Sequence, residues 1–244
     1  MLSRLAAPLI AITALATVLP LLPEEAEAQM SVFTCPGGRM LSVAEGKGLL
    51  QKVQVRYAGL DSMSGTFRQE SYVAALDEGE ASSGEMVFAK PGRMRWTYRL
   101  PREQEVVIRE RELWLYQVDK RQVMIDDIGN VLLSNLPVSF MMGIGDLARD
   151  FELRGACRTP EGVVLNLVPQ KSRASTDKTQ ELEGFQLLVD EGQKLPKGAK
   201  ITSLGGNVTA IVFENLKVGT TQVEERRFVL DLPKGVDVMD RRLQ

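Results

Sequence analysis

The sequence predicts a mainly β protein in which one long antiparallel sheet is combined with a few short helices. Segments with alternating apolar and polar residues recur along the chain, short polar turns separate them, and there is no sustained βαβ alternation. The clearest strand covers residues 93–100, in which polar and apolar residues alternate: Arg93, Met94, Arg95, Trp96, Thr97, Tyr98, Arg99 and Leu100. A strand with this period of two has one apolar and one polar face. The arginines of its polar face are either solvated or a docking patch for an acidic partner.

Residues 1–28 have the features of a cleavable export signal. Arg4 provides a short basic region, residues 5–22 are almost wholly apolar, and Ala26-Glu27-Ala28 fits a small-x-small cleavage site. An uncleaved membrane anchor is the alternative, because about 18 apolar residues can just span a bilayer. Two prolines and two acidic residues within positions 20–25 argue against an anchor. We therefore expect cleavage and export.

The remaining chain is expected to have no net charge. The full sequence has 30 basic and 32 acidic residues, and residues 1–28 contain one basic and three acidic ones, which leaves 29 of each sign. Because binding to phosphates requires a basic excess, nucleic acid is not expected as a partner. The length suits one domain with a real core. We place this domain at residues 45–242, after an N-terminal arm at 29–44.

The absence of histidine limits the chemistry that this chain can perform. It excludes Ser-His-Asp and Cys-His mechanisms, His-ligated zinc and the commonest general base near neutral pH. Two carboxylate pairs, Asp126-Asp127 and Glu110 with Glu112, lie near predicted turns, where paired acids usually solvate the turn. We expect no enzyme activity, no metal and no cofactor. An exported hydrolase is the alternative from another functional class.

Cys35 and Cys157 are the only two cysteines. In an exported chain an even number favours one disulfide, and two unpaired thiols or a metal-binding pair are the alternatives. A bridge would tie the arm to a strand far along the chain, and its role would be structural.

The first element after the arm is predicted to be an amphipathic helix over residues 45–60. Five apolar residues fall near one face at 3.6-residue spacing: Leu49, Leu50, Val53, Tyr57 and Leu60. Gly59 and Asp61 end the helix. Such a helix needs an apolar surface on which to pack.

A meander of antiparallel strands is predicted to follow the helix. Its first strand covers 64–71 and points Phe67 inward, whereas the acidic segment 76–83 is expected to be a solvated loop. Five further strands are separated by short turns, at 85–89, 93–100, 105–109, 112–118 and 121–125.

The segment 131–150 differs from its surroundings because its periodicity is closer to helical. It is rich in apolar residues and is broken by Pro137, Gly143 and Gly145, which predicts two or three short helices joined by glycine hinges. Within it, Met141 and Met142 either adapt to changing partners or simply fill a core, since methionine suits irregular space.

Strands resume after this insert. Six are predicted, at 151–157, 163–168, 184–189, 200–204, 207–217 and 226–231. The polar segment 170–183 is expected to be a long loop, and Gly205-Gly206 is expected to form a tight turn.

A sheet of roughly eleven or twelve strands must curl, so it either closes into a barrel or stays open and is covered. The helix and the apolar insert fit across the mouth of a curved sheet, where they would bury five side chains: Phe67, Phe88, Met94, Trp96 and Leu115. The result is either an ordinary core or a lid over a ligand cavity, and periodicity does not separate the two. An apolar sheet face with no catalytic partner favours holding something apolar.

Several segments also resemble the outer-membrane lipoprotein carrier family of LolA-like periplasmic proteins. The run Phe88-Ala-Lys-Pro-Gly-Arg-Met-Arg-Trp-Thr-Tyr98 resembles the K/R-P-x-x-x-x-W segment of that family. Four other segments fit in the same order: Ser64-Gly-Thr-Phe-Arg-Gln69, Glu112-Leu-Trp-Leu-Tyr116, residues 137–151 and Leu232-Pro-Lys-Gly-Val-Asp-Val238. The likeness covers about residues 45–241.

The resemblance implies an unclosed, strongly curved β half-barrel whose concave side is covered by a helical lid over an apolar cavity. It also implies a periplasmic carrier, which we expect to be a monomer. Such a carrier takes acylated lipoproteins from an inner-membrane ABC-type releasing complex and passes them to an outer-membrane acceptor. A related half-barrel that binds other lipids or senses envelope stress is the alternative.

The family's cavity and lid contacts fall on six residues of this chain: Phe67, Met94, Trp96, Phe140, Met141 and Met142. Its basic residue before the proline, which bonds to the lid and favours the closed state, falls on Lys90. Lysine lacks the planar fork of donors that arginine has, which implies a weaker or differently made latch. The cysteine-bearing arm lies outside the family pattern.

Overall fold

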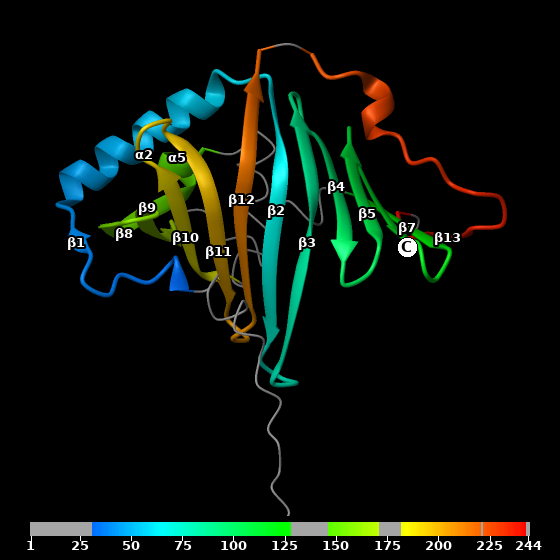
Figure 1. Ribbon diagram of the computed structural model, residues 1–244, viewed down its shortest axis with the longest axis horizontal. Helices are drawn as coiled ribbons and strands as arrows, with labels where there is room; N and C mark the ends of the chain where they lie inside the picture. Colours follow the sequence, from blue (N-terminus) through cyan, green and yellow to red (C-terminus); the bar gives the residue numbers. More distant parts are fainter. Residues whose placement is uncertain (1–30, 128–145, 171–181, 221, 243–244) are drawn as a thin grey trace, which may run out of the picture.

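One curved sheet of thirteen strands makes up most of the described chain (Figure 1). This computed structural model describes residues 31–127, 146–170, 182–220 and 222–242. The strand order is β1-β8-β9-β10-β11-β12-β2-β3-β4-β5-β6-β7-β13, so that within these residues β1 and β13 are edges and the sheet does not close. The predicted fold class, a mainly β, unclosed and curved sheet with few short helices, is confirmed.

The strands have the following bounds: β1 (Arg39–Met40), β2 (Ser62–Val73), β3 (Glu78–Ala89), β4 (Arg93–Leu100), β5 (Gln104–Arg109), β6 (Glu112–Gln117), β7 (Gln122–Asp127), β8 (Phe151–Thr159), β9 (Gly162–Pro169), β10 (Leu182–Asp190), β11 (Leu195–Ser203), β12 (Val208–Gly219) and β13 (Asp237–Asp240). Two antiparallel meanders, β2–β7 and β8–β12, join through the pairing of β12 with β2. After β12 the chain crosses to the far edge, where β13 pairs with β7 in parallel (Figure 1).

Helix α2 (Val43–Ala58) begins at a capping box. The hydroxyl of Ser42 accepts a hydrogen bond from the backbone N–H of Glu45 at 3.2 Å, and the Glu45 carboxylate accepts one from the Ser42 N–H at 2.8 Å. The bond from the Ser42 N–H, with a second one that the Ser42 hydroxyl donates to the same carboxylate at 2.8 Å, holds the pKa of Glu45 below its ordinary value. The helix contacts β8, β11 and the short helix α5 (Leu147–Asp150). It approaches β8 closely because position 46 is glycine, where a Cβ would lie 2.6 Å from the Leu153 side chain.

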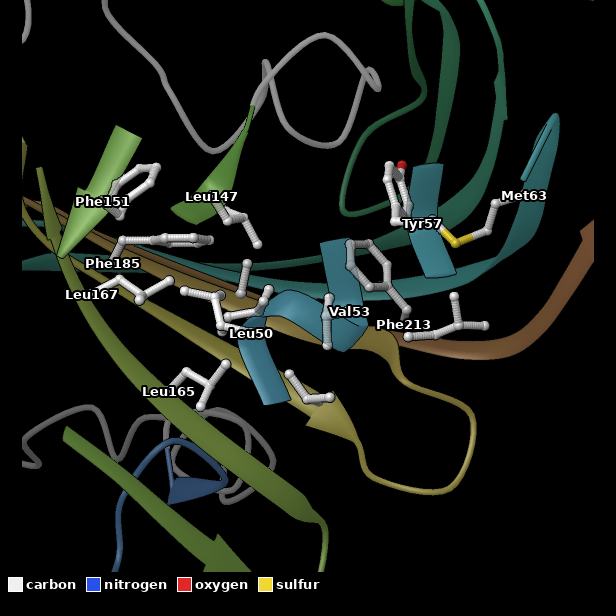
Figure 2. Close-up of a cluster of buried hydrophobic side chains, with 14 of the residues drawn as sticks. Leu50, Val53, Tyr57, Met63, Leu147, Phe151, Leu165, Leu167, Phe185 and Phe213 are labelled. Atoms are coloured by element: carbon white, nitrogen blue, oxygen red, sulfur yellow. The ribbon is translucent and has the colours of Figure 1, made fainter. Parts of the chain in front are cut away.

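The face of the sheet on which α2 packs, called the inner face below, carries the main core. Leu50, Val53 and Tyr57 of α2 lie among the buried side chains of this core in Figure 2. At the β8 end, the rings of Phe151 and Phe185 have centroids 5.2 Å apart. The inward residues of the predicted helix are therefore the ones that hold it on the sheet.

Two smaller clusters cover the outer face. Phe33 of the N-terminal arm packs near Val164 and Leu188, and Phe228 packs near Val107 and other residues of the β3–β6 part of the sheet. The two chain ends therefore act as covers for the side of the sheet opposite α2.

Two element predictions are wrong. Segment 76–83 is not mainly a loop, because β3 begins at Glu78 and pairs with β2 along its full length. Backbone pairing decides this stretch although its side chains are mostly polar and exposed. The strand predicted at 226–231 is instead the 3₁₀ helix η2 (Glu225–Phe228), in which Phe228 alone is buried. Its alternating apolar residues do not pair in the sheet, and only Phe228 packs on the outer face.

The insert predicted at 131–150 lies mostly outside the described residues. Its last part forms α5, where the Asp146 side chain accepts a hydrogen bond from the Arg149 N–H at 3.0 Å. Gly206, in the predicted tight turn between β11 and β12, has a φ of 77°, a conformation that suits glycine.

Candidate apolar binding site

Four aromatic rings from three strands meet on the inner face. The Phe67 ring lies edge-on to Trp96 and Tyr98, with centroid distances of 4.6 and 5.0 Å, and Trp96 is 6.1 Å from Phe213. Phe67 is on β2, Trp96 and Tyr98 are on β4, and Phe213 is opposite Phe67 on β12. Such edge-to-face contacts favour a fixed arrangement of rings.

Gly84 explains why rings on β2 and β4 can touch across the strand between them. It lies opposite Phe67 on one side and opposite Tyr98 on the other. A Cβ at this position would lie 2.0 Å from the Thr97 carbonyl oxygen, so only glycine fits. Because Gly84 has no side chain, it leaves room above β3 in which Phe67 meets its neighbours.

Phe88 and Met94 form the next layer toward α2. They lie opposite each other on β3 and β4, and the Tyr57 ring of α2 stacks on Phe88 with centroids 5.8 Å apart. The Trp96 indole N–H donates to the Met94 sulfur at 2.6 Å. Phe67, Phe88 and Met94 are at most 4% exposed, so they are packed against the protein's own side chains.

The structure separates the remaining candidates from this cluster. Leu115 is half-buried and lies opposite Val106 and Met124, farther along the sheet. Phe140, Met141 and Met142 lie outside the described residues. Thus Phe67, Phe88, Met94 and Trp96 form one continuous group, while Leu115 extends the apolar inner face beyond it.

Lys90 binds the end of α2. Its Nζ donates to the carbonyl oxygens of Tyr57 and Ala58 at 2.9 and 2.6 Å, and it lies 5.9 Å from the centroid of the Tyr57 ring. A cation is favourable at a helix C-terminus, where the last carbonyls lack partners within the helix. Burial lowers the pKa of Lys90, and the nearby Asp61 carboxylate opposes this shift.

Several residues of the cluster were not among the sequence-based candidates. Tyr57, Met63, Met86, Ile108 and Phe213 are all buried within it. The helical periodicity already pointed Tyr57 inward. Phe213 was assigned to a strand, but its place beside Phe67 depends on the pairing of β12 with β2, for which local sequence holds no signal.

A small pocket lies at the N-terminal half of α2, apart from the strands that carry the aromatic cluster. It has a volume of about 230 Å³ and is located between α2, α5 and β8, where Leu50, Phe151 and Leu153 contribute to its wall. Its other lining residues include Lys47, Gln51, Glu152 and Gln170, and none of the lining residues belongs to the aromatic cluster.

The arginines of β4 hold the C-terminal segment in place. Arg93 pairs with Glu225, lies 5.3 Å from the Phe228 ring and donates to the Lys90 carbonyl oxygen at 2.9 Å. Arg95 donates to the carbonyl oxygen of Arg227 at 3.1 Å. At these two positions the polar face of β4 is therefore covered by the C-terminal segment of the chain. Arg93 and Arg95 are neither freely solvated nor exposed as a docking patch for an acidic partner, which were the two interpretations from the sequence.

Cys35 and Cys157 are joined on the outer face. Their Cα atoms are 6.5 Å apart, across 122 positions of sequence. The bond attaches the arm to β8, next to the buried ring of Phe33. Its position away from the aromatic cluster fits a structural role.

The described ranges contain no set of three or more His, Cys, Asp or Glu side chains placed to hold a metal ion. None of the helices in these ranges is long and apolar enough to cross a bilayer.

Comparison with known proteins identifies the family. Residues 58–231 match the family described as outer membrane lipoprotein carrier protein LolA. An outer-membrane lipoprotein carrier protein of Methylococcus capsulatus is 32% identical over 212 residues, covering 85% of this chain and 88% of that protein. A protein of the same name from Halorhodospira halophila is 28% identical over 194 residues, covering 79% and 86%. In fold, the chain is similar to an uncharacterized conserved protein from Thermus thermophilus, with a TM-score of 0.51 at 16% identity, covering 81% of this chain and 99% of that one. This chain belongs to the outer-membrane lipoprotein carrier protein family, LolA.

Proposed function

We propose that this protein is a periplasmic carrier that binds the acyl chains of lipoproteins on the inner face of its curved sheet. The observation that carries the proposal is the continuous aromatic and methionine cluster of Phe67, Phe88, Met94 and Trp96 under a helix, in a member of the carrier family. Residues 1–28 would be removed as a signal peptide during export.

The free energy of exposing acyl chains makes a carrier necessary. Exposing an acyl chain of ~16 carbons to water costs on the order of 10 kcal/mol at ~0.8 kcal/mol per CH₂. A lipoprotein with two or three such chains does not cross an aqueous compartment unaided. A curved apolar surface that excludes water would remove much of this cost.

Entry of an acyl chain would require movement of α2. Phe67, Phe88 and Met94 are at most 4% exposed, so a guest reaches them only when the side chains packed above them move away. Trp96 and Leu115, which are half-buried, would contact the guest earlier. The predicted lid residues Phe140, Met141 and Met142 would complete the surface.

Lys90 would act as the latch between the closed and open states. It holds the last carbonyls of α2 with two hydrogen bonds from one ammonium group. An ammonium is a compact donor without the rigid fork of a guanidinium, so the helix end can be released one bond at a time. Loss of both bonds would free the C-terminal end of the helix.

The carrier would receive its cargo from an inner-membrane ABC-type releasing complex and pass it to an outer-membrane acceptor. Handover without an energy source at the second membrane requires tighter binding by the acceptor than by the carrier. Moderate affinity is therefore part of the function.

A release experiment tests the proposal. Inner-membrane vesicles that hold a triacylated lipoprotein and the releasing complex are incubated with ATP and the mature chain, and the supernatant is analysed after centrifugation. We expect a soluble one-to-one complex of lipoprotein and carrier, and no release with the Trp96→Glu variant. A wild-type protein that is folded but leaves all lipoprotein in the membrane would refute the proposal.

A further inference from the structure

The inner face of β2–β6 changes from apolar to polar toward one end of the strands. There it forms a pocket of about 250 Å³ near the turns that follow β2, β4 and β6. Five of its lining residues are uncharged groups able to form hydrogen bonds: Gln69, Ser82, Tyr98, Gln104 and Gln117. These residues, called the amide row below, lie at the polar border of the aromatic cluster.

The strand register places the amide row on one face. Gln69 lies opposite Ser82, Tyr98 lies opposite Gln104, and Gln104 lies opposite Gln117. Residues directly opposite each other in antiparallel strands share a face of the sheet. Tyr98, Gln104 and Gln117 therefore lie at one level across β4–β6, whereas Gln69 and Ser82 lie two residues farther along β2 and β3, beyond Phe67 and Gly84.

Tyr98 belongs to both regions. Its ring contacts Phe67 at a centroid distance of 5.0 Å, while its hydroxyl is hydrogen-bonded to the Gln69 amide oxygen at 3.1 Å. Burial raises the pKa of Tyr98 to about 12, against a smaller lowering by the Gln69 hydrogen bond. The hydroxyl is thus neutral at physiological pH, and a molecule lying along β4 passes directly from aromatic to amide surroundings.

The charged residues at the rim of the pocket do not form a site for phosphate. Arg102 is paired with Glu80 at 2.7 Å, and the other charged lining residues are Glu103, Asp119 and Lys120. Acidic groups therefore outnumber basic ones at the rim. A phosphate group needs a basic excess or a fork of donors, and this pocket offers neither.

The amides of Gln104 and Gln117 are available for a ligand. Within the described part of the chain, neither side chain has a hydrogen bond or ion pair to another residue. A glutamine amide offers two donors and one acceptor, which matches the carbonyl and N–H groups of esters and peptide bonds.

We infer that the amide row binds the neutral ester and amide groups that join the acyl chains of a lipoprotein to its N-terminal residues. The inference rests on the proposed carrier function and adds a second subsite to it. The aromatic cluster holds the hydrocarbon, and the amide row recognises the linkage. A free fatty acid has neither the ester nor the amide groups, and a phospholipid has the glyceryl esters but no amide. The row therefore favours lipoproteins most strongly over free fatty acids, and over phospholipids through the amide groups alone.

The test compares two probes on the full mature chain. One is a synthetic peptide whose N-terminal cysteine carries a dipalmitoylglyceryl group, and the other is palmitic acid, each measured by displacement of a fluorescent fatty acid. We expect the double variant Gln104→Leu/Gln117→Leu to bind the lipopeptide about tenfold more weakly and palmitic acid within twofold of wild type. Gln193→Leu, an exposed position in the β10–β11 turn, is the matched control and should change neither affinity.

The outcomes separate this inference from the proposed function. Equal losses for the two probes, or no loss for either, would overturn the amide row while leaving the apolar site intact. A wild-type protein that binds neither probe would overturn the carrier function and the amide row together. If the double variant is not folded, Gln104→Glu keeps the size of the side chain but removes the amide donors. It should give the same selective loss for the lipopeptide, and equal affinities would again contradict the inference.

Discussion

Replacement of Lys90 by methionine should loosen α2 without unfolding the sheet. Methionine keeps most of the length and apolar character of the lysine stem, but it cannot donate to the carbonyl oxygens of Tyr57 and Ala58, which now accept bonds at 2.9 and 2.6 Å. Hydrogen bonds from charged groups contribute ~1.5–3 kcal/mol when buried. Because Lys90 is only partly buried, solvent screening reduces the loss to about 1–2 kcal/mol for the pair.

A loss of this size should raise the population of the open state about 5–30-fold. Hydrogen exchange of the α2 amides is the direct measurement, because each amide exchanges when the helix opens locally. We expect α2 to exchange faster by that factor, while β8–β10 exchange at the wild-type rate. The uptake of a fluorescent fatty acid should accelerate in parallel.

Lys52→Met is the matched control, because Lys52 lies on the exposed side of the same helix. Like Lys90→Met, it replaces one ammonium group with methionine, but it removes no hydrogen bond to the end of the helix. Equal exchange rates in the two variants would refute the assignment of Lys90 as the latch, since the effect would then follow from charge alone. Lys90→Arg should restore slow exchange, because a guanidinium can donate to both carbonyls.

Three further perturbations test other parts of the structure. Trp96→Glu should abolish binding of a fluorescent fatty acid, because a carboxylate would be placed among aromatic rings, and unchanged binding would remove Trp96 from the site. Gly84→Ala should lower the free energy of unfolding, measured in urea, by about 2–4 kcal/mol, because a Cβ at position 84 would clash with the backbone of β4. The control Gly48→Ala, which has open space around it, should raise the free energy of unfolding by up to ~1 kcal/mol. Equal effects of the two substitutions would contradict the packing described for Gly84. Arg93→Met should loosen the segment around Glu225 and make it more sensitive to trypsin under native conditions, and full resistance would show that Phe228 and the Arg95 hydrogen bond hold it without Arg93.

The parts of the fold that the sequence predicted well are those with a strong local pattern. Strand 93–100 was predicted with its exact bounds, because apolar and polar residues alternate along its whole length, and burial on the apolar face decreases from Met94 to the exposed Leu100. The helix was displaced by only two residues, since the five predicted inward residues all lie in the core, although Leu60 comes after the end of α2. In both cases local periodicity and tertiary burial agree.

The errors occur where burial does not follow the local pattern. In the first half of β3, residues 78–81 are exposed on both faces and only Ser82 is buried, so alternation gave no signal. The segment of η2 shows the opposite error, because its apolar residues alternate as in a strand but its backbone does not pair with the sheet. The two apolar residues that follow Phe228 at alternate positions suggested a strand, but only Phe228 is buried.

The site was predicted in composition more than in geometry. Phe67, Phe88, Met94 and Trp96 were chosen as inward residues, and they do meet. Their meeting depends on Gly84, whose missing side chain is recognised only after β2, β3 and β4 are in register. Phe213 is separated from Phe67 by most of the chain, and no local pattern links the two residues.

The packed state of the aromatic cluster bears on how tightly cargo can bind. Native side chains already fill the space around Phe67 and Met94. An acyl chain that enters therefore replaces existing apolar contacts within the protein by contacts between the protein and the acyl chain. The favourable free energy of binding then comes from the transfer of the hydrocarbon out of water. The free-energy costs of displacing packed side chains and of opening α2 reduce it. The net value per chain should therefore lie well below the ~10 kcal/mol that burial alone would give. Each added acyl chain should also contribute less than the first, because the inner face has a limited area. With this energy balance, the proposed carrier would keep acyl chains out of water and still release them to the tighter-binding acceptor that we propose.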